Sequence, residues 1–206
     1  MKKSLSFSYY LFNLLLAIFL LILLLPIFLL TALSIKFTSG GSIMFKQKRV
    51  GHNRKEFIMY KFRTMIDGAE KMQKKYLNLN TASGPTFKIS NDPRFTKIGK
   101  FLSHSNLDEL PQIINVLKGD MFFVGFRPPI EEEVRKYKEP QLKRFEAYPG
   151  ITSLWAISGA HSIPFNNWIN MDLNYENERS MLNDIKIIFV TAFKPILFII
   201  RQIRIL

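Results

Sequence analysis

Residues 14–35 read LLLAIFLLILLLPIFLLTALSI, and this apolar stretch decides how the chain is organised. It belongs to a longer segment between Lys3 and Lys36 that contains 32 residues and no charge. About 18 to 20 apolar residues are enough for a membrane helix. A secretory signal peptide has a shorter apolar core and a cleavage site of small residues, which this segment does not match. A buried globular helix would be less uniformly apolar over such a length, so the segment predicts a helix that enters a bilayer.

A proline within this segment predicts that the membrane helix is bent. As a straight helix, the segment would measure roughly 48 Å at about 1.5 Å per residue, whereas the hydrocarbon layer is roughly 30 Å thick. Pro26 lacks the N–H of a helical hydrogen bond and clashes with the preceding turn, which produces a kink. Basic residues flank the segment on both sides: Lys2, Lys3, Lys36, Lys46, Lys48 and Arg49.

These flanking charges predict the topology of the segment. The positive-inside rule favours a cytoplasmic location for both ends. We therefore expect a re-entrant membrane helix over residues 1–37, kinked at Pro26, followed by a cytoplasmic-face domain over residues 38–206. A single tilted span with a periplasmic N-terminus is the alternative that the two N-terminal lysines leave open.

The overall charge and the absence of cysteine narrow the classes of function. Lys and Arg total 29 against 16 Asp and Glu, which gives a formal net charge of +13. Such an excess favours an anionic partner, namely nucleic acid, an anionic membrane surface or a phosphorylated substrate. The chain contains no cysteine, which excludes disulfides, thiol catalysis and cysteine-ligated zinc.

Patterns in the rest of the chain predict an α+β domain that is small and rich in helices, with a short β-hairpin. The hairpin turn is expected around Gly51 to Asn53. Gly119 follows the helix that begins near Asp108 and is expected to cap it in a left-handed conformation. The last helix combines apolar residues with spaced basic ones, which is typical of an amphipathic helix at a membrane interface. The expected elements are strands at 43–49 and 56–62, helices at 67–80, 94–102 and 108–118, a strand at 121–125, and helices at 130–145 and 184–206.

The sequence SHSNLDELPQ at residues 103–112 places two adjacent carboxylates, Asp108 and Glu109, at the start of a helix. Pro111 locates this start, because proline is tolerated only in the first turn of a helix. The N-cap is then expected at Asp108, or at Asn106 with Glu109 completing a capping box. Carboxylates in a first turn also interact favourably with the helix dipole. Helix capping is therefore one sufficient explanation for the pair.

The surroundings of the pair favour a chemical role as well. A carboxylate held at a helix N-terminus near basic residues is a usable nucleophile. A second carboxylate can hold Mg²⁺ together with substrate phosphates. Arg127, which follows a buried strand and precedes Pro128, offers a rigid guanidinium for a phosphate. Together with a membrane helix, these groups indicate chemistry on a lipid phosphate.

Five motifs carry a specific resemblance when they are taken together and in order. The chain resembles the bacterial sugar transferases. These are monotopic phosphoglycosyl transferases, which begin glycan assembly on polyprenol phosphate. The similarity extends from the N-terminal apolar helix to NDIKIIFVTA at 183–192. The motifs are YKFRTM at 60–65, NDPRFTKIGKFL at 91–102, LDELPQIINVLKGDM at 107–121, VGFRP at 124–128 and PGITSLW at 149–155.

The resemblance implies a two-step reaction at the cytoplasmic face of the bacterial inner membrane. Asp108 would attack the β-phosphate of a UDP-sugar, release UMP and hold the sugar phosphate covalently. Undecaprenyl phosphate would then accept the sugar phosphate, which initiates synthesis of a surface glycan such as an exopolysaccharide. Glu109 would be the second catalytic carboxylate and would bind the Mg²⁺ cofactor.

The resemblance also implies further site residues and partners. Lys61, Arg63 and Arg127 match positions that bind substrate phosphates, and Asp172 and Asp184 match carboxylates of the C-terminal part of the active site. The implied partners are a UDP-sugar donor, undecaprenyl phosphate and membrane lipids, without nucleic acid. A homo-oligomer and association with other glycan-assembly proteins stay open.

The chain departs from the family pattern at five positions. Phe126 stands where relatives commonly have proline, and Ser103 and His104 stand where arginines are frequent. Ala156 and Ala160 replace a glutamine and an arginine. These departures predict a different donor sugar or a lower activity.

Two other functions compete with this one. A catalytically inactive member of the family could scaffold a glycan-assembly complex, and it would release no UMP. A membrane-tethered basic module could bind nucleic acid or anionic lipid by charge alone. Such a module would need neither Asp108 nor magnesium, and its binding would weaken steeply with salt.

Overall fold

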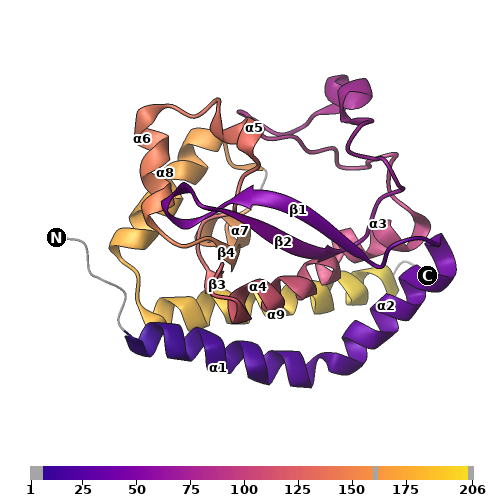
Figure 1. The fold of residues 1–206 in the computed structure, drawn as a ribbon, viewed down its shortest axis with the longest axis horizontal. Helices are drawn as coiled ribbons and strands as arrows, with labels where there is room; N and C mark the ends of the chain where they lie inside the picture. Colours follow the sequence, from indigo (N-terminus) through magenta and orange to yellow (C-terminus); the bar gives the residue numbers. More distant parts are fainter. Residues whose placement is uncertain (1–6, 160–161, 204–206) are drawn as a thin grey trace.

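The N-terminal part of the structure is a pair of apolar helices joined at a sharp bend. The computed structural model describes residues 7–159 and 162–203. Helices α1 (Phe7–Leu23) and α2 (Leu25–Ser39) are inclined to each other by 61° (Figure 1). Pro26 lies in the first turn of α2, where its missing N–H has no helical partner in any case. The kink predicted at Pro26 is confirmed.

The course of this helix pair through a membrane stays a prediction. Within the described residues, no single helix is long and apolar enough to cross a bilayer by itself, whereas α1 and α2 meet these requirements together. Lys2 and Lys3, on which the predicted topology partly depends, lie outside the described residues.

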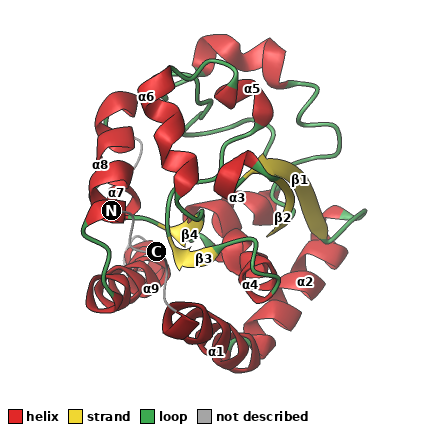
Figure 2. Ribbon diagram, turned by 60° about the vertical axis from the view of Figure 1, so that its left-hand side comes forward, coloured by secondary structure: helices red, strands yellow, loops and turns green. Residues whose placement is uncertain are grey.

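The remaining elements form two small sheets with short helices around them (Figures 1 and 2), which confirms the α+β class. Strands β1 and β2 form an antiparallel hairpin in which Phe45 lies opposite Lys61. Strands β3 and β4 are parallel neighbours, with Phe122 opposite Gly150. In chain order, with 3₁₀ helices labelled η, the elements are β1 (Met44–Val50), η1 (His52–Arg54), β2 (Glu56–Phe62), η2 (Gln73–Leu79), α3 (Lys97–His104), η3 (Leu107–Gln112), α4 (Ile113–Leu117), β3 (Phe122–Val124), α5 (Glu131–Val134), α6 (Glu139–Leu142), η4 (Lys143–Glu146), β4 (Gly150–Thr152), α7 (Leu154–Ile157), α8 (Phe165–Asn177) and α9 (Met181–Ile203).

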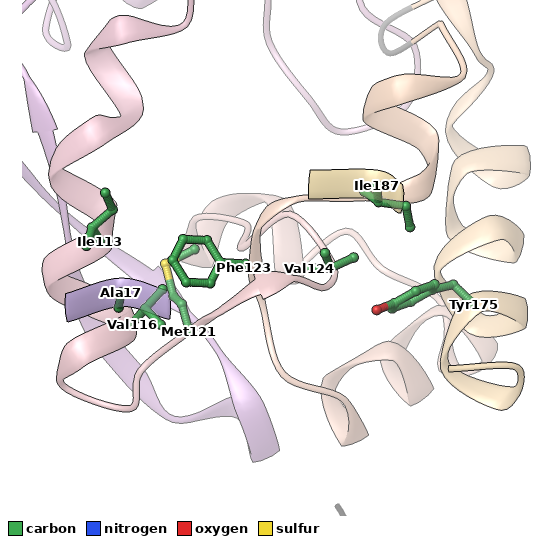
Figure 3. Packing of buried hydrophobic residues seen from close by; sticks show 8 residues of the cluster. All are labelled: Ala17, Ile113, Val116, Met121, Phe123, Val124, Tyr175 and Ile187. Atoms are coloured by element: carbon green, nitrogen blue, oxygen red, sulfur yellow. The ribbon is translucent and has the colours of Figure 1, made fainter. Parts of the chain in front are cut away.

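The main hydrophobic core lies around β3 and joins the first helix to the last. Phe123 and Val124 of β3 lie between Ala17 of α1 on one side and Ile187 of α9 on the other (Figure 3). Asn13 of α1 is also buried, and its side-chain oxygen accepts the Phe123 N–H at 2.9 Å. An asparagine within an apolar helix thus satisfies a buried backbone donor of β3, which fixes α1 to the domain.

Two predicted helices are broken in the structure. The polar helix predicted at 67–80 is wrong, because this segment turns at left-handed Gly68 (φ 78°) and then forms η2, which is interrupted at Tyr76. The charged helix predicted at 130–145 is wrong as a single unit. It divides into α5, α6 and η4, because Pro140 fits only in the first turn of a new helix, α6.

Other boundaries shift by a few residues. The helix predicted at 94–102 begins later, because the Thr96 hydroxyl oxygen accepts the Gly99 N–H at 3.0 Å and caps α3. The last helix begins earlier than predicted, at Met181. The hairpin, the short strand after the acidic pair and left-handed Gly119 (φ 77°) are confirmed.

Helices α1, α2 and α9 expose apolar side chains along one side of the molecule. In Figures 1 and 2 these helices lie along the same edge, away from the tip of the β1–β2 hairpin. Many exposed apolar side chains on helices that lie along one edge are typical of a domain that contacts a lipid bilayer. The exposed side chains include Leu15, Phe19, Ile22, Leu29, Leu33, Phe37, Leu182, Ile185, Phe189 and Ile196.

Candidate active site

Asp108 and Glu109 lie beside Lys61 where η3 contacts β2. The Lys61 ammonium donates to Glu109 Oε1 at 2.6 Å and lies 3.8 Å from Asp108 Oδ2. Asp108 is buried, with 7% of its surface exposed, whereas 32% of the Glu109 side chain is exposed. The fold therefore brings together three residues that the sequence assigned to one site.

The backbone of η3 presents both carboxylates to this lysine. Asn106 precedes η3 in a left-handed conformation (φ 58°), and its carbonyl accepts the Glu109 N–H at 3.2 Å. Pro111 has no N–H to donate, and the chain winds as a tight 3₁₀ helix until α4 begins. Of the two N-cap positions that the sequence left open, the structure has Asn106, but the capping box predicted for it does not form. As the structure describes this segment, Asp108 lies inside η3 and the Asn106 side chain makes no capping bond, because capping needs an extended backbone at that residue.

The position of Asp108 has an electrostatic consequence. Burial raises the pKa of the Asp108 carboxyl to about 7, nearby Lys61 opposes this rise, and Glu109 adds to it. Asp108 is therefore close to the balance between its charged and neutral forms at neutral pH. Further positive charge brought to the site would favour the charged form, which is the form that can act as a nucleophile.

Asn115, which the sequence analysis missed, fixes β2 to α4. Its side-chain oxygen accepts the Tyr60 N–H at 3.1 Å, and its amide donates to the Ile58 carbonyl at 2.6 Å. The same amide donates to Asp120 Oδ2 at 3.1 Å. Because Lys61 follows Tyr60 on β2, this clamp sets the position of Lys61 relative to η3. Its place within LDELPQIINVLKGDM is the sequence signal that could have found it.

Arg127 is held rigidly after β3. Its guanidinium donates two hydrogen bonds to the Glu133 carboxylate, at 2.9 and 3.3 Å, and lies 5.7 Å from the ring centre of Trp168. Arg49 of β1 donates to the Pro128 carbonyl at 3.0 Å, which ties the loop that carries Arg127 to the hairpin.

Glu109 lies in the field of four cations, which we call the cation cluster. Lys61 pairs with Glu109 directly, and the other three interact with it electrostatically. Burial, together with repulsion from Arg127, lowers the pKa of Arg49 to about 9. All four cations interact with Glu109, so the site can bind an anionic ligand beside the carboxylate pair of η3. The cation cluster consists of Arg49, Lys61, Lys88 and Arg127.

Arg63 ties the end of β2 to α2. It donates to Asp67 Oδ1 at 2.9 Å, and to the carbonyl and hydroxyl oxygens of Ser39 at 3.2 Å each. Gly41 has a left-handed conformation (φ 65°), which favours glycine where the chain leaves α2, and a Cβ there would lie 2.4 Å from Arg63 Nη1 and displace this guanidinium. The structure does not bring Arg63 into contact with the carboxylate pair of η3 within the described residues, and its phosphate-binding role stays a prediction.

Asp172 and Asp184 have partners of their own. The Arg144 guanidinium donates to Asp172 at 2.6 Å and to the Arg127 carbonyl at 3.2 Å, so Asp172 supports the loop of Arg127. Asp184 accepts a hydrogen bond from the Tyr175 hydroxyl. Burial raises the pKa of Asp172 to about 7 and that of Asp184 to about 8. Among the described residues neither contacts the η3 pair, and their catalytic roles stay predictions.

Positions that depart from the family pattern have packing roles in this fold. Phe126 is buried against Phe145, with ring centres 5.5 Å apart. The ring of His104 packs on the edge of an aromatic residue of the preceding loop. The Ala156 carbonyl accepts a hydrogen bond from a lysine of α9. Ala160 lies outside the described residues.

The fold and the site together define a class of protein. A small α+β domain joins a bent apolar helix pair to a buried aspartate and a half-buried glutamate among several cations. This arrangement suits phosphate chemistry next to a lipid surface. The chain belongs to the bacterial sugar transferase family, because the family model matches residues 5–197. This membership confirms the resemblance carried by the motifs.

Three relatives illustrate the similarity. Galactosyl transferase CpsE of Streptococcus agalactiae is 49% identical over 153 residues, which cover 74% of this chain and 34% of the relative. Exopolysaccharide production protein ExoY of Sinorhizobium fredii is 38% identical over 184 residues, which cover 87% of this chain and 81% of the relative. Undecaprenyl-phosphate galactose phosphotransferase of Salmonella typhimurium is 38% identical over 157 residues, which cover 74% of this chain and 33% of the relative. The chain thus spans about a third of two of these relatives and about four fifths of the other.

Proposed function

We propose that this chain transfers a sugar 1-phosphate from a UDP-sugar to undecaprenyl phosphate and releases UMP. Family membership supports a sugar transferase, and the name of the Salmonella relative supports a polyprenyl phosphate as acceptor. The observation that carries the proposal is the environment of Asp108. This carboxylate is buried inside η3, has no capping role and lies 3.8 Å from the Lys61 ammonium.

In the first step, a carboxylate oxygen of Asp108 forms a bond to the β-phosphorus of the donor. The bond from this phosphorus to the bridging oxygen breaks, and UMP leaves. Lys61 neutralises charge next to the attacking carboxylate, and Arg127 supplies a fixed guanidinium for the phosphate oxygens. In the second step, an oxygen of undecaprenyl phosphate bonds to the same phosphorus, and Asp108 leaves as a carboxylate.

The donor atoms of the site fit Mg²⁺. This ion prefers oxygen ligands and usually binds through one or two carboxylates, substrate phosphates and water. Glu109 Oε1 is bound by Lys61, so the other carboxylate oxygen of Glu109, together with Asp108, would hold the ion. When bound, Mg²⁺ would neutralise the negative charge of the phosphates. Within the described residues no group of three His, Cys, Asp or Glu side chains gathers as a metal site.

The apolar side formed by α1, α2 and α9 is proposed to seat the domain on the cytoplasmic face of the inner membrane. The helix pair would enter the bilayer and return, which keeps the site at the height of the lipid phosphates. A lipid acceptor and a water-soluble donor could then meet at the same carboxylate.

A panel of UDP-sugars tests this function. Purified protein in lipid nanodiscs should release UMP from one or a few of them, and addition of undecaprenyl phosphate should make the release continuous. Excess chelator should abolish turnover, and added Mg²⁺ should restore it. Release of no UMP from any sugar, with the protein folded, would favour the scaffold function; full activity in chelator would rule out magnesium.

A further inference from the structure

Lys88 is a member of the cation cluster whose ammonium has no hydrogen-bond or ion-pair partner within the described residues. Its side chain is exposed, although partial desolvation lowers its pKa. It interacts electrostatically with Glu109 and Asp108, and also with Lys61 and Arg127. The other cations are engaged: Lys61 with Glu109, Arg127 with Glu133, and Arg49 with Gln47 and the Pro128 carbonyl.

The loop around Lys88 is built around one asparagine. Asn80 Oδ1 accepts the backbone N–H of Lys88 at 2.8 Å and that of Ala82 at 3.1 Å, and the Asn80 amide donates to the Thr86 carbonyl at 3.1 Å. The Thr81 N–H donates to the Lys88 carbonyl at 2.8 Å, which closes the loop. Both backbone groups of Lys88 are therefore bonded within the loop, so its side chain starts from a fixed position.

The same loop is docked on α8, the helix that supports the Arg127 loop. The Ser83 hydroxyl accepts the Phe165 N–H at 2.9 Å. Gly84 has a left-handed conformation (φ 69°), and a Cβ there would lie 2.6 Å from the Phe165 ring. Two independent constraints, the Asn80 bonds and this close approach, hold the loop of Lys88 against α8, whose Trp168 ring lies 5.7 Å from the Arg127 guanidinium. A lysine on a freely moving surface loop would have neither.

We propose that Lys88 binds the diphosphate of the sugar-nucleotide donor at the Asp108 site. This inference rests on the proposed function and extends its phosphate-binding set to a residue outside the recognised motifs. Lys88 can bind an incoming anion without breaking an existing ion pair, whereas Lys61 and Arg127 already pair with carboxylates.

The placement of the loop favours the donor over the lipid acceptor. In Figure 1 most of the segment between β2 and α3 lies on the side of the hairpin opposite to α1 and α2. A water-soluble nucleotide reaches the site from that side, whereas the phosphate of a membrane lipid arrives from the side of the helix pair. Loss of Lys88 should therefore weaken donor binding and leave the acceptor step unchanged.

Binding of UDP to the full chain in nanodiscs tests this inference without catalysis. Lys88→Gln should raise the Kd for UDP about tenfold or more, as expected for loss of a charged hydrogen bond to phosphate. Lys88→Arg should keep the Kd within about threefold of wild type. Lys74→Gln removes an exposed lysine of η2 on the same segment and should change nothing.

Turnover measurements distinguish binding of the donor diphosphate from binding of the acceptor phosphate. They also test the role of Lys88 separately from the proposed function. Lys88→Gln should raise the KM for the active UDP-sugar about tenfold and leave the KM for undecaprenyl phosphate unchanged. Suppose that wild type binds UDP and releases UMP, whereas Lys88→Gln keeps the wild-type Kd for UDP and the wild-type KM for the donor. This result would overturn the role of Lys88 and leave the proposed function intact. An effect confined to the acceptor KM would also overturn the role of Lys88. Failure of wild type to bind UDP would overturn both this inference and the proposed function.

Discussion

Two buried aspartates show how the surroundings of a single residue set its charge. Asp108 shares the Lys61 ammonium with Glu109, so a cation partly offsets the cost of burying its charge. Asp184 is buried with 1% of its surface exposed, and its carboxylate accepts a hydrogen bond from the neutral Tyr175 hydroxyl. The carboxyl of Asp184 is therefore expected to stay protonated in the folded protein at neutral pH, because burial raises its pKa to about 8.

This raised pKa predicts a pH dependence of stability. In the unfolded chain an aspartate has a pKa of about 3.9. Between this value and about pH 8 the folded state binds one proton more than the unfolded state at Asp184. The contribution of Asp184 to the free energy of unfolding is thus largest below pH 4 and is lost as the pH rises toward 8.

Asp184→Asn tests this dependence, because the amide oxygen can still accept from Tyr175 but does not titrate. The Tm of the variant should exceed that of wild type by an amount that grows between pH 5 and 8, measured by thermal unfolding in detergent. Glu178→Gln, at an exposed position at the end of α8, is the control and should follow wild type. Parallel pH profiles for Asp184→Asn and wild type would contradict the account.

Among individual site residues, the sequence predicted those that lie in short, chemically distinctive motifs. Asp108 and Glu109 stand out because they are adjacent carboxylates before a proline, and Arg127 because it is pinned by Pro128. Lys88 gave no such signal. Its role depends on an electrostatic interaction with the η3 carboxylates that exists only in the folded chain, and no local pattern encodes that interaction.

At the scale of elements, the contact between β2 and α4 holds the site together. Asn115 replaces a missing neighbouring strand, because its side chain pairs with the Tyr60 N–H and the Ile58 carbonyl of β2. Both backbone groups would lose their partners if this side chain were removed. Lys61 would then lose the support that sets its distance from the carboxylates of η3.

Asn115→Ala should lower the free energy of unfolding by about 2–3 kcal/mol, because it leaves the partly buried Tyr60 N–H and Ile58 carbonyl without their partner and empties a buried position. Denaturant unfolding in detergent measures this loss, and UMP release should fall with it. Asn177→Ala, at an exposed position on α8, should change stability by no more than about 0.5 kcal/mol. A fully stable Asn115→Ala would show that the clamp is dispensable.

Elements with strong local signals were predicted correctly, and elements shaped by single residues were not. The hairpin strands and Gly119 follow from alternating patterns and turn chemistry. Gly68 and Pro140 broke two predicted helices, because a left-handed glycine and a proline each outweigh a weak helical pattern. The 3₁₀ form of η3 likewise depends on left-handed Asn106, which its residue type alone does not reveal.

At the scale of the whole molecule, the protein combines an apolar side with a site for an anionic ligand. Helices α1, α2 and α9 contribute the apolar side (Figure 2), and the cation cluster lies at the hairpin. The kink at Pro26 could be predicted because proline acts locally. The packing of α1 against β3 through Asn13 could not, since it joins residues 110 positions apart.

The re-entrant course of the helix pair predicts that the N-terminus is cytoplasmic. The chain has no cysteine of its own, so single cysteines introduced at Ser4 and at Lys74 can be labelled separately. In intact cells both should resist an impermeant thiol reagent and react only after lysis. Labelling of Ser4→Cys from outside, with Lys74→Cys protected, would instead establish a single tilted span.

The central claim is that Asp108 is the nucleophile of a two-step transfer. Asp108→Asn keeps the size and the hydrogen-bonding oxygen of the side chain, so the variant should fold and stay bound to the membrane. An amide cannot form the acyl phosphate, and the chemical step should be lost.

The most direct measurement is UMP release by a known amount of enzyme in the absence of undecaprenyl phosphate. Wild type should release about one equivalent of UMP per active site, because the intermediate cannot pass its sugar phosphate on. Folded Asp108→Asn should release none. Release of UMP by the folded variant, or a wild type that releases none until the acceptor is added, would contradict the covalent mechanism.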